Sequence, residues 1–119
     1  NRSLTKYKLI IDEFGGWAQF QQLLAALQAI ATRQHCDIAT VATRAMLDQP
    51  GVAAAIVGAT STAHLAAHER IGAVVLTAAE RAAIAAVTDR RRGPPGDVYA
   101  LERDREGPHG RIMKYGLNK

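Results

Sequence analysis

The sequence predicts a mainly helical chain with at most one or two short strands. Of its 119 residues, 48% are apolar but only 5% are aromatic, and alanine supplies much of the apolar share. Such a composition favours helices with small side chains over thick strands. Two further observations agree: apolar residues recur at helical spacing after Gly15-Gly16, and helix-start signatures occur at Asp37 and Thr77.

The first clear helix is predicted from Trp17 to about Gln34. Its apolar residues recur three and four positions apart, which indicates one buried face. That face comprises Trp17, Phe20, Leu23, Leu24, Leu27, Ile30 and Ala31. The thirteen residues at the start of the chain show no sustained period. We assign them no element, although Tyr7 to Ile11 is compatible with a strand or a helical turn.

A second helix is predicted from Ile38 to Gln49. Asp37 is a suitable N-cap, and Pro50-Gly51 ends the helix. Arg44 interrupts the apolar side, and we expect it to form a surface ion pair with a carboxylate. The residues expected on the buried face are Val41, Ala42, Ala45 and Met46.

The best strand candidate runs from Val52 to Val57, because it is apolar without alternation. A lone buried strand would leave its backbone N–H and C=O groups unpaired, at a cost of about 1–3 kcal/mol for each group. Three outcomes are open: pairing with a strand over Tyr7 to Ile11, pairing with a second copy of the chain, or replacement of the β structure by helix, which the alanines tolerate. We therefore expect self-association, as a homodimer.

Two more helices are predicted after this run. One extends from about Thr62 to Ile71, with Ser61 as its cap. The other begins at the capping box of Thr77 and Glu80 and ends near Asp89. Its expected apolar side consists of Ala83, Ile84 and Val87.

The chain is expected to divide into a helical portion, residues 1–92, and a charged tail rich in glycine and proline, residues 93–119. Residues 97–103 are compatible with one helical turn, and the remainder reads as extended. Residues 1–89 hold seven basic and seven acidic side chains, so the net charge of +4 arises in residues 90–119. Arg90 to Arg92 lack interleaved aromatic residues and a binding motif, so we expect no nucleic-acid partner.

Several function classes are excluded by what the sequence lacks. It contains no apolar run of membrane-spanning length and no signal-peptide pattern, so we expect a soluble, cytoplasmic protein without a membrane partner. Cys36 is the single cysteine and cannot form an intrachain disulfide, so we interpret it as a thiol at a helix boundary. His64 and His68 share a helical face, but two ligands do not make a metal site.

The most informative segment is the junction at Gly58, where the apolar run turns into a helix. Glycine lets the backbone approach a ligand, and the free N–H groups at a helix start favour an anion. The order of residues around this junction resembles the last βα unit of the aldo-keto reductases. The resemblance extends from Ala45–Val52 through Ile56–Ser61 to Leu76–Glu80.

This resemblance implies a fragment of a (β/α)8 TIM barrel, corresponding to the carboxyl-terminal third of an NADPH-dependent reductase. In that family the loop holds the 2′-phosphate and adenosine end of NADP. Ala67 and His68 depart from the acidic residue and the asparagine that family members usually carry, which implies a weakened site. The cofactor-binding residues implied by the resemblance are Gly58, Ala59, Thr60, Ser61, His64 and His68.

No catalytic residue is expected in this chain. The family's Asp, Tyr, Lys and His tetrad lies on early barrel strands, and none of Tyr7, Tyr99 and Tyr115 stands in a matching context. The complete enzyme would reduce a small carbonyl substrate by hydride transfer, whereas the isolated chain is expected to be inactive. The alternative is an autonomous helical protein, derived from a truncated reductase, that self-associates or binds a partner.

Overall fold

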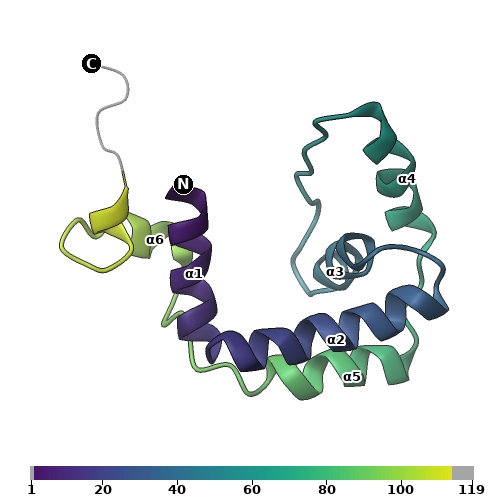
Figure 1. The fold of residues 1–119 in the computed structure, drawn as a ribbon, viewed down its shortest axis with the longest axis horizontal. Helices are drawn as coiled ribbons and strands as arrows, with labels where there is room; N and C mark the ends of the chain where they lie inside the picture. The colour runs from purple at the N-terminus through teal and green to yellow at the C-terminus, as the bar shows by residue number, and fades with distance from the viewer. Residues whose placement is uncertain (1, 114–119) are drawn as a thin grey trace. The chain divides into compact units, whose positions relative to one another are not determined.

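The fold was analysed in a computed structural model, which describes residues 2–113 (Figure 1). The described part of the chain is mainly helical and contains no strand. The helices are α1 (Arg2–Phe14), α2 (Trp17–Arg33), α3 (Ile38–Leu47), α4 (Leu65–Ala73), α5 (Ala78–Thr88) and α6 (Val98–Arg103), with 3₁₀ turns η1 (Thr62–His64) and η2 (Gly110–Ile112).

Two compact units make up the chain. One unit is Gln21–Asp89, and the other combines the described residues up to Phe20 with those from Arg90 onward. None of the described helices is alone long and apolar enough to cross a membrane, although α4 and α5, bent by 110°, pass that test as a pair on length and composition.

The core of the 21–89 unit is formed by α2, α3 and the segment between α4 and α5. Ile30 and Val41 are completely buried, and Leu76 is almost so. Alanines and branched residues pack around them, and Ile84 of α5 joins their edge. The buried members of this core are Leu27, Ile30, Ala31, Val41, Val74 and Leu76. The predicted stripe on α2 is therefore confirmed at its carboxyl-terminal half.

A Schellman motif ends α2. The N–H of Cys36 donates to the carbonyl of Ala31 (3.0 Å), and the N–H of His35 donates to that of Thr32 (3.3 Å). His35 adopts a positive φ of 52°, as this motif requires. Cys36 packs against the core, and burial raises the pKa of its thiol. The interpretation of Cys36 as a boundary thiol is thus confirmed.

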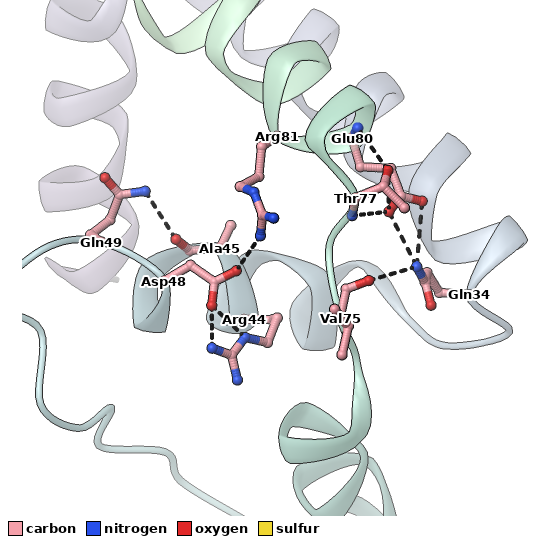
Figure 2. Close-up of polar contacts among 9 residues, drawn as sticks. All are labelled: Gln34, Arg44, Ala45, Asp48, Gln49, Val75, Thr77, Glu80 and Arg81. Atoms are coloured by element: carbon pink, nitrogen blue, oxygen red, sulfur yellow. Dashed lines mark hydrogen bonds and ion pairs between the residues drawn. The ribbon is translucent and has the colours of Figure 1, made fainter.

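Both predicted helix caps are confirmed. The Asp37 carboxylate accepts a hydrogen bond from the N–H of Thr40 (2.6 Å), and Thr77 and Glu80 form the reciprocal capping box of α5. Figure 2 shows Glu80 turned toward Gln34, whose amide also donates to the carbonyl of Val75 (3.2 Å).

Arg44 pairs with a carboxylate, as expected. Its guanidinium donates through Nε to Asp48 (2.9 Å) and also contacts that carboxylate through Nη2. The second oxygen of Asp48 accepts from Arg81 of α5 at 3.2 Å (Figure 2). One carboxylate thus links α3 to α5, and the two guanidinium groups lower the pKa of Asp48.

The strand prediction for Val52 to Val57 is wrong. These residues have no regular structure between α3 and η1 (Figure 1). Ala53 to Val57 are exposed, and Ile56 is fully so. The reason is that no partner strand lies within the described chain, so the backbone polar groups are satisfied best in water. Tyr7 to Ile11 is not a strand either, because it lies within α1.

Four smaller expectations need correction. Trp17 is 64% exposed and Met46 is 58% exposed, so neither belongs to the core. The cap of α4 is His64, not Ser61, and it makes no side-chain capping bond. Finally, α6 agrees with the helical turn expected over residues 97–103, but the described residues after it are not simply extended, because η2 lies among them and His109 is buried.

The second unit joins the two ends of the chain. Glu13 of α1 accepts hydrogen bonds from Nε2 of buried His109, at 2.8 and 2.9 Å. Lys6 of α1 pairs with Glu102 of α6 at 2.7 Å, and the N–H of Arg92 donates to the carbonyl of Phe14 at 3.1 Å. These contacts hold residues 92–113 against α1.

Candidate functional site

A pocket of about 220 Å³ lies between α3, α4 and the segment that precedes η1. The amino-terminal half of α3 forms one wall and α4 forms the opposite wall, while Val57 and Gly58 close one side. The lining residues are Asp37, Ala39, Thr40, Thr43, Val57, Gly58, His64, Ala67, His68 and Ile71.

Thr40 holds the two walls together. Its backbone N–H donates to the Asp37 carboxylate, and its hydroxyl donates to the carbonyl of Ala67 on α4 (3.4 Å). Thr40 of α3 and Ile71 of α4 are both buried. The distance between α3 and α4 is therefore set by packed, hydrogen-bonded residues, and the pocket is preformed.

Three ionisable side chains line this pocket, and they come from three places in the chain. Asp37 precedes α3, His64 ends η1, and His68 lies on α4. The Thr40 hydrogen bonds lower the pKa of Asp37, and the charges of His64 and His68 lower it further. Asp37 is therefore ionised at neutral pH. Among the described residues, no lysine or arginine lines the pocket, and its basic side chains are the two imidazoles.

The six cofactor residues expected from the resemblance fall into two neighbouring recesses. Gly58, His64 and His68 line the first pocket. The other three line a more open recess of about 320 Å³ together with Thr62 and Leu65. These three residues are Ala59, Thr60 and Ser61. The loop and the helix start are thus adjacent, but no strand leads into them.

The geometry at Gly58 differs from the expected one. A Cβ atom placed there would meet no other atom within 4 Å, so crowding does not require glycine. The start of α4 also offers fewer free N–H groups, because η1 precedes it and the N–H of His64 donates to the carbonyl of Ser61 (3.1 Å). Side chains therefore contribute more to this pocket than free helix N–H groups do.

Sequence reasoning missed the α3 wall of the pocket. Asp37 was expected only as a cap, and Thr40 and Thr43 were not singled out. The spacing of Asp37 and Thr40 signals the cap but contains no information about α4, which supplies the other wall. Among the described residues, no group of three or more His, Cys, Asp or Glu side chains is placed to hold a metal ion.

In a comparison with protein families, the model of the Aldo/keto reductase family matches residues 1–89. No curated protein and no solved structure matches the chain. The match includes both walls of the pocket and the loop between them. The helical architecture is consistent with a fragment of the fold of that family, whose members generally use nicotinamide cofactors. The chain belongs to the aldo/keto reductase family.

Proposed function

We propose that this chain is the carboxyl-terminal portion of an NADPH-dependent aldo-keto reductase, and that its pocket binds the phosphate-bearing adenosine end of the nucleotide. The observation that supports this most directly is the convergence of Gly58, His64 and His68 on one preformed pocket. The resemblance to the aldo-keto reductases implies that these residues contact the cofactor.

The residues present fit part of the cofactor. The Thr43 hydroxyl and the imidazoles of His64 and His68 supply hydrogen-bonding groups, and Ala67 and Ile71 supply apolar surface. The volume of about 220 Å³ lies below the roughly 300–1,000 Å³ typical of sites that enclose a whole ligand. The pocket would therefore accommodate one end of the dinucleotide and not the whole of it.

When bound in a complete enzyme, the nicotinamide would supply the hydride for carbonyl reduction. The residues of this chain contribute binding and orientation, because no described cluster offers a proton donor beside the pocket other than the two histidines. We therefore propose that the isolated chain binds nucleotide without reducing a carbonyl.

The test is a titration with NADP, followed by calorimetry and by the shift in melting temperature. Binding to the folded state raises its stability by linkage, by about 2.7 kcal/mol when the ligand stands at one hundred times Kd. Ala67→Leu places a larger side chain in the pocket, and Ala66→Leu makes the same change at an exposed neighbour. Binding is expected in the parent chain and in Ala66→Leu, and at least tenfold weaker in Ala67→Leu.

Two results would contradict the proposal. The absence of any thermal or calorimetric response at millimolar NADP would show that the pocket has no nucleotide role. Oxidation of NADPH by an aldehyde, present in the parent chain and lost in Ala67→Leu, would show that the chain is itself catalytic. Circular dichroism of each variant establishes that the helices are retained.

A second function is favoured by a specific observation in the 21–89 unit. Ile56, Val57, Leu65 and Val75 expose between 45% and 105% of their surface. We propose that these side chains mediate self-association, the alternative role expected for an autonomous helical protein.

A further inference from the structure

We propose that residues 53–57 form a proteolytic cleavage site for serine endopeptidases with a small apolar specificity pocket, and that the chain stays folded as a two-chain complex once it is cut there. This inference does not depend on the proposed nucleotide-binding function. It assigns a modification site to a segment that contributes only Val57 to the lining of the pocket.

The backbone of this segment is accessible along its whole length. Residues 53–57 have no regular structure (Figure 1) and are exposed. In the described chain, the backbone hydrogen bonds that flank the segment run from the N–H of Val52 to the carbonyl of Gln49 and from the N–H of His64 to the carbonyl of Ser61. A serine endopeptidase binds its substrate as an extended chain whose N–H and C=O groups bond to the enzyme. Residues 53–57 present such a chain without prior unfolding.

The side chains of the segment select the class of enzyme. Residues 53–57 read Ala-Ala-Ala-Ile-Val, and residues 51–61 carry no charged side chain. The specificity pocket of elastase is small and accepts side chains of this size, whereas that of trypsin contains an aspartate and requires arginine or lysine. Elastase should therefore cut this segment, and trypsin should not.

Exposed alanines elsewhere in the 21–89 unit are protected by their helices. Ala25 of α2 and Ala82 of α5 are exposed, but their peptide bonds lie inside hydrogen-bonded turns. A protease reaches such bonds only when the helix opens locally, which slows cleavage by the ratio of closed to open molecules. We therefore expect cleavage within residues 53–57 to be at least about 100-fold faster than cleavage within α2 or α5.

The core of the 21–89 unit would hold the two products together. Ile30 and Val41 precede the cut and Leu76 follows it, and all three belong to one buried cluster. The ion pair of Asp48 with Arg81 (3.2 Å) also joins residues on opposite sides of the cut. Separation of the products would therefore expose the core to water, which is unfavourable.

The second unit also contains residues from both sides of the cut. Glu13 accepts from Nε2 of buried His109 at 2.8 and 2.9 Å, and Lys6 pairs with Glu102 at 2.7 Å. Each unit is thus assembled from both products, so hydrolysis of one peptide bond removes the covalent connection without removing these contacts.

The reaction consumes one water molecule. The peptide C–N bond breaks, the water oxygen bonds to the carbonyl carbon, and the released nitrogen takes up a proton. The new ends are a carboxylate and an amine, so the masses of the two products sum to that of the parent chain plus one water.

The experiment treats the full chain with elastase in native buffer, at a concentration at which it sediments as a monomer. Mass spectrometry should find two products that meet within residues 53–58. Sedimentation should keep both products in one species of the parent mass, and urea should separate them. The absence of a cut in residues 53–58, or a faster cut within a helix, would overturn the cleavage site. Products that separate without denaturant would overturn the two-chain complex.

Ala55→Arg and Ala29→Arg form a matched pair that isolates the role of the backbone. Both replace an exposed alanine with arginine, but residue 55 lies in the segment and residue 29 lies in α2. Arginine is a good helix former, and circular dichroism of both variants checks that the helices are retained. Trypsin should cut after residue 55 at least about 100-fold faster than after residue 29. Equal rates at the two positions would overturn the inference.

Discussion

At the scale of single residues, Glu80 shows how a buried charge is accommodated. The residue is 5% exposed. Its carboxylate accepts from the N–H and hydroxyl of Thr77 (2.9 and 3.1 Å) and from the amide of Gln34 (3.2 Å), and Arg33 lies 3.5 Å away. The hydrogen bond from the Thr77 N–H is the main cause of its lowered pKa. These bonds offset the cost of removing the charge from water.

Replacing Glu80 with glutamine should destabilise the chain in a pH-dependent manner. The NH2 group of the glutamine would replace a carboxylate oxygen that faces the N–H donors of Gln34 and Arg33. We therefore expect the free energy of unfolding to fall by about 1–3 kcal/mol at pH 7. Because the folded state lowers the pKa of Glu80, its contribution is present above the ordinary glutamate value, near 4.3, and is lost as the pH falls through the lower folded value. The difference from the parent chain should therefore shrink toward pH 3.

Urea unfolding at pH 7 and pH 3 measures this difference. Glu69→Gln is the control, because Glu69 is exposed and its replacement should change stability by less than about 0.5 kcal/mol. Equal destabilisation by Glu80→Gln at both pH values would show that the charge of Glu80 contributes nothing.

At the scale of elements, the sequence predicts those helices whose signals are local. The N-caps Asp37 and Thr77 identify the starts of α3 and α5, because each side chain bonds to a backbone N–H three residues later. The apolar stripe from Phe20 to Ala31 identifies α2. The strand prediction for residues 52–57 was wrong because a strand needs a pairing strand from another part of the chain, and local sequence does not report whether one is present. The same reasoning holds at the site: the loop at Gly58 could be recognised from its own residues, whereas the α3 wall depends on tertiary packing.

The carboxyl-terminal segment folds because Gly110 permits a close backbone approach. A Cβ atom at Gly110 would overlap the carbonyl oxygen of Asp104, which is backbone and cannot swing away. A Cβ atom at Gly107 would meet mainly the side-chain carboxylate of the same aspartate, at 2.6 Å, and that group can rotate. The two glycines therefore differ in what an alanine would displace.

Gly110→Ala should loosen η2 and the neighbouring Glu13–His109 contact, at a cost of about 1–3 kcal/mol. Gly107→Ala should cost much less. Amide hydrogen exchange of residues 104–113 measures the effect, with the amides of α3 and α4 as an internal reference. Equal protection of this segment in the two variants would contradict the steric argument.

At the scale of the whole molecule, the feature that favours self-association is exposed apolar surface and not an unpaired strand edge. An unpaired strand edge was expected to seek a partner, but residues 53–57 are exposed to water without regular structure. Apolar side chains now provide the driving force, since Ile56 is fully exposed and Val75 is 73% exposed. Burial of a side chain of this size contributes about 1.5–3 kcal/mol.

Self-association is therefore predicted to depend on Ile56. Sedimentation velocity across a range of concentrations should show species heavier than the 12.8 kDa monomer. If Ile56 is buried once in each copy, Ile56→Asp removes two such contributions from a dimer, which weakens its association by at least about 100-fold. Thr60→Asp adds the same charge to the same exposed segment without removing an apolar side chain, so it should associate like the parent chain. A monomer at all concentrations, or equal weakening by both variants, would show that apolar burial at Ile56 does not drive assembly.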